Sequence, residues 1–207
     1  MSARNNAQAP RRAEFSRDTR ETQIAAALNL DGTGRAKIAT GIGFLDHMLE
    51  SFAKHSAFDL ELTAKGDLHV DMHHTTEDTG IVLGLMFKEA LTESGQSFTG
   101  IQRFGHFYVP MDETLTRASV DLCNRPYFVW KVALDRPKLG DMDTELFKEW
   151  FHAFAMNAGI CLHIETLYGE NTHHKVESCF KALARALRMA VMRDTQIVGP
   201  ASTKGVF

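Results

Sequence analysis

Apolar residues recur along the chain with two alternating periods. Alternate apolar positions predict strands that start at Glu21 and Glu113, because successive side chains of a strand point to opposite faces. Apolar residues at positions i, i+1, i+4, i+5 and i+8 predict amphipathic helices in the segments that start at Gly43 and Glu145. The apolar faces comprise Phe44, Leu45, Met48, Leu49 and Phe52 in the first helix, and Leu146, Phe147, Trp150, Phe151 and Phe154 in the second.

After each of these helices the pattern returns to period two, and a second helix follows. The strands start at Phe58 and Ile160, and the closing helices span roughly residues 76–94 and 174–192. Each half of the chain therefore reads strand, strand, helix, strand, helix. Amphipathic helices pack on one face of a sheet, so two such halves predict an α+β fold with two mixed sheets that enclose a layer of four helices.

The repeat also predicts the organisation of the chain. We expect a disordered polar tail over residues 1–14, a first half-repeat over 15–95 and a second over 96–207, joined near Gly95–Gly100. With 207 residues, the two halves suffice for one compact unit with a shared core.

Composition narrows the class of protein. Hydrophobic residues make up 44% of the chain and charged residues 24%, and the net charge of −3 gives no general attraction to nucleic acid or an anionic membrane. The N-terminus lacks a secretory signal, and no apolar run reaches the ~20 residues of a membrane span. Three cysteines without a CxxC motif favour a reducing compartment. We therefore expect a cytoplasmic protein without nucleic-acid or membrane partners.

Two histidine pairs carry the most chemical information. His73-His74 and His173-His174 are each followed by a glutamate, in HHTTE and HHKVE. Adjacent helical residues point about 100° apart, whereas a histidine and the glutamate four residues later share a face. The motifs predict two metal ions, each with ligands from more than one segment.

The repeat adds two further candidate ligands on the preceding helices, His47 and Glu149, which occupy aligned positions. Histidine and carboxylate ligands without thiolates fit Mn, Fe, Zn or Ni better than a structural zinc site. The candidate ligands are His47, His73, His74, Glu77, Glu149, His173, His174 and Glu177.

Basic and hydroxyl side chains in loop-like contexts suggest an anion site. Guanidinium groups bind phosphate through two hydrogen bonds, and lysine adds a point charge. No GxxxxGK[ST] motif and no GxGxxG after a strand occurs, which disfavours a nucleotide. The candidates are Arg103, Arg125, Lys181, Ser202, Thr203 and Lys204.

The segments FLDHM, HHTTEDTG, QRFG, NRPY, HHKVESCFKA and STKG, in this order, resemble the imidazoleglycerol-phosphate dehydratase family. The resemblance covers the chain from about Arg20 to Phe207. It implies a monofunctional hydro-lyase of histidine biosynthesis that converts D-erythro-imidazole glycerol phosphate to imidazole acetol phosphate and water. It also implies two Mn(2+) ions per active site and a homo-oligomer of 24 subunits with shared active sites.

The resemblance also implies roles for single residues. One ion would be bound by His47, His74, His173 and Glu177, and the other by His73, Glu77, Glu149 and His174. The phosphate group would contact Arg103, Arg125, Lys181, Ser202, Thr203 and Lys204.

The reaction removes a proton that no carbonyl group acidifies. We expect two metals on the substrate ring to favour the imidazolate, which expels the neighbouring hydroxyl to give a diazafulvene-like intermediate. The next carbon then loses its proton, and the enol becomes the ketone. Glu21 is the predicted acid/base group and substrate contact, with His73 and Glu177 as further catalytic residues. Asp112 and Glu113 are weaker acid/base candidates.

Two alternatives stay open at this point. A two-metal phosphohydrolase would also use histidine, glutamate and basic residues, although it commonly has bridging aspartates, which this ligand set lacks. A metal-storing shell or helical metal-binding module would leave Arg103, Arg125 and Lys181 unexplained.

Overall fold

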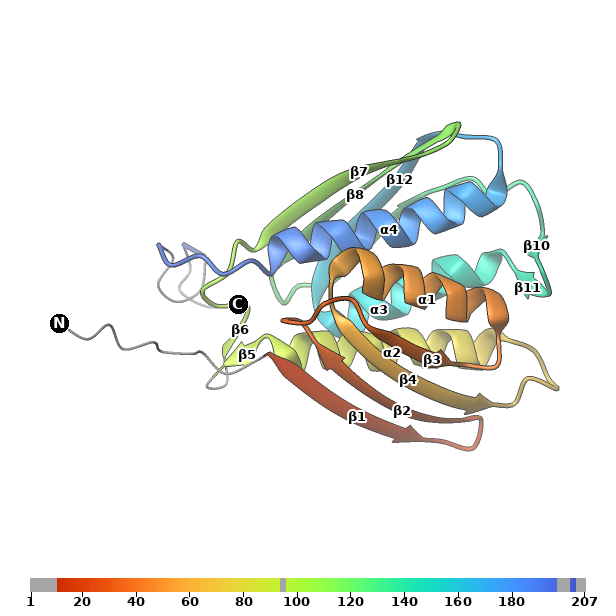
Figure 1. Cartoon of the computed structure of the whole chain (residues 1–207), viewed down its shortest axis with the longest axis horizontal. Helices are drawn as coiled ribbons and strands as arrows, with labels where there is room; N and C mark the ends of the chain where they lie inside the picture. Colours follow the sequence, from red (N-terminus) through yellow and green to blue (C-terminus); the bar gives the residue numbers. More distant parts are fainter. Residues whose placement is uncertain (1–10, 94–95, 197–201, 204–207) are drawn as a thin grey trace.

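Two four-stranded sheets form the outer layers of the protein, and four helices lie between them (Figure 1). The computed structural model describes residues 11–93, 96–196 and 202–203, and these counts refer to those residues. The predicted α+β fold with two mixed sheets around a helical layer is confirmed.

The first half forms a sheet of order β1-β2-β4-β3, in which β3 runs parallel to β4 and the other neighbours are antiparallel. Its helices pack on one face of this sheet. The elements are β1 (Arg12–Asp18), β2 (Thr22–Asn29), β3 (Ala36–Ala39), α1 (Gly43–Ser56), β4 (Asp59–Gly66) and α2 (His73–Ala90).

The second half repeats this arrangement with the sheet order β7-β8-β12-β9, again with one parallel pair, β9 and β12. Two short hairpins are added, β5 with β6 and β10 with β11. The elements are β5 (Thr92–Glu93), β6 (Gln96–Ser97), β7 (Phe104–Met111), β8 (Thr114–Leu122), β9 (Tyr127–Lys131), β10 (Lys138–Leu139), β11 (Met142–Asp143), α3 (Glu145–Ala158), β12 (Ile160–Tyr168) and α4 (Thr172–Ala190).

Some predicted boundaries change. Each half has three strands before its first helix, where the pattern predicts two. β1 begins at Arg12, so the tail expected through residue 14 ends earlier, and residues 1–10 lie outside the described part. The boundary expected between residues 95 and 96 falls at the β5–β6 hairpin, where residues 94–95 are not described.

The closing helices begin before the predicted residues 76 and 174, so both histidine pairs lie in a first helical turn. The side chain of Asp71 accepts a hydrogen bond from the backbone N–H of His73 (2.7 Å). Asn171 does the same for His173 (2.9 Å). Such caps satisfy N–H groups that a helix start leaves without partners, which extends each helix by a few residues beyond its apolar pattern.

The core lies between the helices and the inner faces of both sheets. The predicted apolar faces are buried, apart from the half-buried Phe44. Aromatic side chains join the halves at the centre, where the rings of Trp150 and Phe154 stack with centroids 5.7 Å apart and Phe52 contacts both edge-on. The single core accounts for the duplicated halves behaving as one unit.

Helices of different halves pack in parallel pairs. A Cβ atom added to Gly80 would lie 2.8 Å from the carbonyl oxygen of Trp150, and one added to Gly84 would lie 2.6 Å from that of Phe154. The same chain direction in α2 and α3 follows, because both sets of contacts advance together. α1 and α4 form the other pair, and all four helices start at the same end of the molecule (Figure 1).

Within the described residues, we find no helix with the length and apolar character needed to cross a lipid bilayer.

We predict that Gly84→Ala lowers the free energy of unfolding by about 1–3 kcal/mol, because the added methyl group must push α3 away from α2. Alanine would otherwise favour the helix by up to ~1 kcal/mol, so a loss isolates the clash. Chemical denaturation measures this difference. Gly43→Ala is the control, since an added Cβ there meets nothing within 4 Å. Equal stability of the two variants would contradict the tight packing.

Candidate functional site

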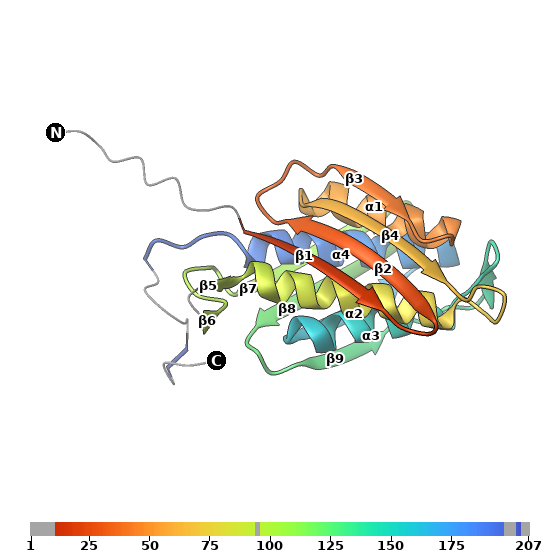
Figure 2. The same cartoon turned by 90° about the horizontal axis from the view of Figure 1, so that it is seen from below.

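The predicted histidine and glutamate ligands gather where the four helices begin. His47 lies in the second turn of α1, Glu149 at the aligned place in α3, and the HHxxE motifs open α2 and α4. Figure 2 shows the helices side by side under the sheet of the first half. The shared direction of the helices therefore brings ligand candidates from four segments to one end of the protein.

The clearest cluster joins α1 and α4. One ligand atom each from His47, His173 and Glu177 lies within 4.8 Å of the others. The Nε2 atoms of His173 and His47 are 3.0 and 3.7 Å from one oxygen of Glu177. The edge of the Phe44 ring packs against His173, with centroids 5.2 Å apart. Two imidazoles and a carboxylate in this arrangement form an N/O donor set of the kind that manganese accepts.

Lys181 lies one helical turn beyond Glu177 and donates a hydrogen bond to its other oxygen at 2.7 Å. Burial raises the pKa of Glu177, but the hydrogen bond and charge of Lys181, with the hydrogen bond from His173, outweigh it and hold the pKa below its ordinary value. The carboxylate is therefore ionised at neutral pH, as a metal ligand must be. The cluster also places a cation beside the predicted metal site.

The second cluster is more open. Nε2 of His73 lies 3.8 Å from Glu77 on the exposed side of α2. Glu149 is half-buried on the neighbouring helix α3, where the first cluster has His47 on α1. This arrangement repeats the first cluster, with a carboxylate in place of one imidazole.

The other histidine of each pair faces elsewhere, as the helical geometry predicts. The Nε2 atom of His74 lies 3.8 Å from Glu21, and Nδ1 donates a hydrogen bond to Asp67 (2.9 Å). That hydrogen bond raises the pKa of His74 and lowers the pKa of Asp67. The sequence reasoning missed Asp67, because no periodic or motif signal marks it.

His174 has equivalent neighbours. Its Nδ1 donates to Glu113 at 2.7 Å, and its Nε2 lies 3.7 Å from Asp112. Backbone N–H donors, first that of Asn171, together with the His174 hydrogen bond, lower the pKa of Glu113 far below its ordinary value. The predicted acid/base candidates Asp112 and Glu113 therefore lie on opposite sides of one imidazole ring.

Glu21 lies exposed at the turn between β1 and β2, and a buried contact fixes this turn to α2. The backbone N–H of Glu21 donates to the hydroxyl of Thr19 at 3.2 Å. The hydroxyl of the next residue, Thr22, donates a short hydrogen bond to the buried Asp78, whose other oxygen pairs with Arg17 at 3.2 Å. Sequence reasoning missed Asp78, although it directly follows Glu77.

The predicted phosphate residues divide between the two ends of the molecule. The backbone N–H of Arg103 donates to Ala190, the last residue of α4, and Arg125 follows Asn124, which packs against the C-cap of α3. The helix from His173 to Ala190 is roughly 25 Å long, so within one chain Arg103 is far from the first cluster.

Arg103 adopts a left-handed backbone conformation (φ 68°), and its guanidinium group donates hydrogen bonds to Asp121 at 2.6 and 3.1 Å. Ser202 is half-buried and Thr203 exposed, whereas Lys204 lies outside the described residues. Of the predicted phosphate contacts, the structure brings Lys181 to the histidine clusters.

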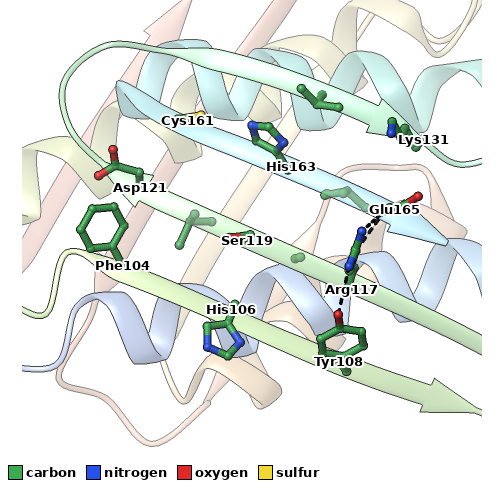
Figure 3. A pocket seen from close by; sticks show the side chains of 14 residues that line it. Phe104, His106, Tyr108, Arg117, Ser119, Asp121, Lys131, Cys161, His163 and Glu165 are labelled. Atoms are coloured by element: carbon green, nitrogen blue, oxygen red, sulfur yellow. Dashed lines mark hydrogen bonds and ion pairs between the residues drawn. The ribbon is translucent and has the colours of Figure 1, made fainter. Parts of the chain in front are cut away.

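A hollow of about 780 Å³ lies on the outer face of the second sheet (Figure 3). Its polar lining includes Arg117, which bridges Tyr108 and Glu165. None of the predicted site residues lines it. The candidate site is therefore the helix end, not this sheet face.

Fold and site together define a class of internally duplicated α+β proteins with paired histidine–carboxylate clusters at a common helix end. Comparison with known proteins gives the family. A profile of the imidazoleglycerol-phosphate dehydratase family matches residues 40–187. The chain is 63% identical over 198 residues to the imidazoleglycerol-phosphate dehydratase of Phenylobacterium zucineum, which covers 95% of this chain and 99% of that protein.

The corresponding enzyme of Azorhizobium caulinodans is 57% identical, over 95% of this chain and 98% of its own. The chain therefore belongs to the imidazoleglycerol-phosphate dehydratase family, as the resemblance predicts. This makes it a hydro-lyase of histidine biosynthesis and removes the phosphohydrolase and metal-storage alternatives.

Solved structures agree. The Staphylococcus aureus imidazoleglycerol-phosphate dehydratase superposes with a TM-score of 0.78 at 38% identity, over 88% of this chain and 99% of that chain. The Pyrococcus furiosus protein gives 0.79 at 37% identity, over 93% and 100%.

We predict that Asp78→Ala loosens the β1–β2 turn, because Thr22 loses its buried acceptor and Arg17 its ion pair. The free energy of unfolding should fall by roughly 1–3 kcal/mol, and the amides of Glu21 and Thr22 should exchange hydrogen faster.

Hydrogen exchange followed by mass spectrometry measures this, with Asp18→Ala at an exposed position of the same hairpin as the control. Unchanged exchange in the Asp78 variant would show that the contact does not anchor the turn.

Proposed function

We propose that the protein converts D-erythro-imidazole glycerol phosphate to imidazole acetol phosphate and water. Membership of the dehydratase family supports the reaction class. The observation that carries the proposal is the cluster of His47, His173 and Glu177 with Lys181 directly beside it. It combines donors for a cation with an ammonium group for a phosphate ester.

The donor set fits manganese. We propose that His47, His173 and Glu177 hold one Mn(2+) with His74 as a fourth ligand, and that His73, Glu77 and Glu149 hold the second with His174. The first three residues already lie within one coordination distance of a common centre, without any thiolate. Three carboxylates near four helix N-termini also offset the positive ends of the helix dipoles, which would otherwise disfavour a cation.

We further propose that neighbouring copies complete each site in a homo-oligomer, of 24 subunits by the family resemblance, in the cytoplasm. Two features support sharing. His74 and His174 face away from the clusters of their own chain, toward Asp67 and Glu113. Arg103 lies roughly 25 Å along α4 from His173, farther than a small phosphate ester extends. A second copy can bring these residues to the cluster.

Two bound manganese ions would supply positive charge that favours the ionised substrate ring. Lys181, with Arg103 and Arg125 of other copies, binds the phosphate and fixes the glycerol chain relative to the ring. Once the ring has expelled the hydroxyl to give the predicted diazafulvene-like species, Glu21 takes the proton from the next carbon. Its carboxylate is exposed and lies beside Nε2 of His74, on a turn that Asp78 holds in place.

We predict that His173→Ala and His73→Ala each remove about one of two manganese ions per chain, and that the double variant removes both. Each substitution deletes one donor from a different cluster. Metal analysis after dialysis measures the content. His106→Ala, an exposed histidine of β7, is the control. Unchanged metal content in the double variant would refute the proposed centre.

We predict that Glu21→Gln retains manganese and the Michaelis constant to within a few-fold but lowers kcat by roughly 10²–10⁴-fold, because the amide cannot accept the proton. Steady-state kinetics with imidazole glycerol phosphate, following the ketone product, measures this. Glu14→Gln makes the same change at an exposed position of β1 and should leave kcat unchanged. Turnover near the wild-type value in the Glu21 variant would remove this residue from the mechanism.

A further inference from the structure

Both outward-facing histidines make the same contact with a carboxylate. Nδ1 of His74 donates to Asp67 at 2.9 Å, and Nδ1 of His174 donates to Glu113 at 2.7 Å. In both rings Nε2 faces the opposite side, toward Glu21 in one case and Asp112 in the other. A neutral imidazole that donates from Nδ1 has its lone pair on Nε2, so each carboxylate selects the same tautomer.

Each carboxylate is itself held in place. The side chain of Glu113 accepts hydrogen bonds from the backbone N–H groups of Asn171 (2.8 Å) and Glu170 (3.0 Å) and from the hydroxyl of Thr114 (2.9 Å). These contacts connect the turn between β7 and β8 to the start of α4. The rigid carboxylate therefore fixes the ring plane of His174 as well as its tautomer.

Asp67 follows β4 directly, and its backbone ties it to the Glu21 turn. Its N–H donates to the carbonyl oxygen of Glu21 at 3.0 Å, and its own carbonyl accepts from Val70 at 2.8 Å. The side chain is largely buried, with 17% of its surface exposed. Asp67 thus links the orientation of His74 to the turn that carries Glu21.

The two carboxylates are not copies of each other in the repeat. Asp67 comes from the segment between β4 and α2, whereas Glu113 comes from the turn before β8 and aligns with Glu21 in the first half. Simple duplication does not account for two different elements reaching the same nitrogen of equivalent histidines. A shared requirement for an orienting carboxylate does.

We propose that Asp67 and Glu113 are positioning residues that hold His74 and His174 with Nε2 available as a metal ligand. The inference rests on the proposed function, because it takes both histidines as manganese ligands. It also separates Glu113 from the acid/base role and leaves Glu21 and Asp112 on the side of the ring where Nε2 lies. Loss of such an outer partner commonly weakens metal binding roughly 10–100-fold.

The test is a manganese titration of the metal-free full-length protein, in which electron paramagnetic resonance reports free Mn(2+). The wild-type chain should bind two ions. Asp67→Ala should weaken one of them roughly 10–100-fold and Glu113→Ala the other, and the double variant should weaken both. Asp31→Ala is the control, because that carboxylate pairs with Arg11 outside the site.

Conservative variants separate positioning from a structural role. Asp67→Asn and Glu113→Gln keep an oxygen that accepts the Nδ1 proton, so each should restore most of the affinity lost in the alanine variant. Melting temperatures and elution volumes are compared for all variants. If an alanine variant fails to fold, its amide variant still decides, since near-wild-type affinity supports the inference and a loss of tenfold or more overturns it.

Two wild-type-like affinities in both alanine variants would overturn the inference while leaving the manganese proposal standing. A wild-type chain that binds no manganese would overturn both.

Discussion

Parallel packing of helices from different halves is the constraint on which the rest of the structure depends. Because α1 runs with α4 and α2 with α3, both HHxxE motifs and their partners from α1 and α3 reach one end of the protein. Gly80 and Gly84 allow the close approach of α2 to α3, and the buried aromatic side chains around Trp150 fix the pairing. An antiparallel arrangement would place the two members of each cluster at opposite ends of the bundle.

The charges at this end are balanced by contacts between neighbouring helical turns and loops. Glu177 is buried yet ionised, because Lys181 and His173 both donate hydrogen bonds to it. Asp67 and Glu113 occupy the far side of the two outward-facing histidines. Each histidine therefore has one nitrogen committed to a protein acceptor and the other turned outward. Such an arrangement prepares a ring for a ligand that its own chain does not supply.

The sequence predicts most of the fold because its apolar periods are strong and occur twice. The apolar faces of α1 and α3 and the alternation in β2, β4, β8 and β12 leave little freedom in the layer order. The short β3 and the added hairpins escaped prediction, since four or fewer residues give no readable period. Spacing alone predicts His73 with Glu77 and His173 with Glu177, because i and i+4 share a helical face. It gives no access to Asp67 or Asp78, whose roles depend on loops and tertiary contacts.

The central claim is that two cation sites at the helix N-termini are completed by a neighbouring copy. The most direct measurement is anomalous diffraction at the manganese edge from crystals of the manganese-loaded protein. The account predicts two anomalous peaks per chain, one at His47, His173 and Glu177 and one at His73, Glu77 and Glu149. It also predicts that the His74 and His174 ligands at these peaks come from another copy. Absence of both peaks, or peaks coordinated entirely within one chain, would contradict it.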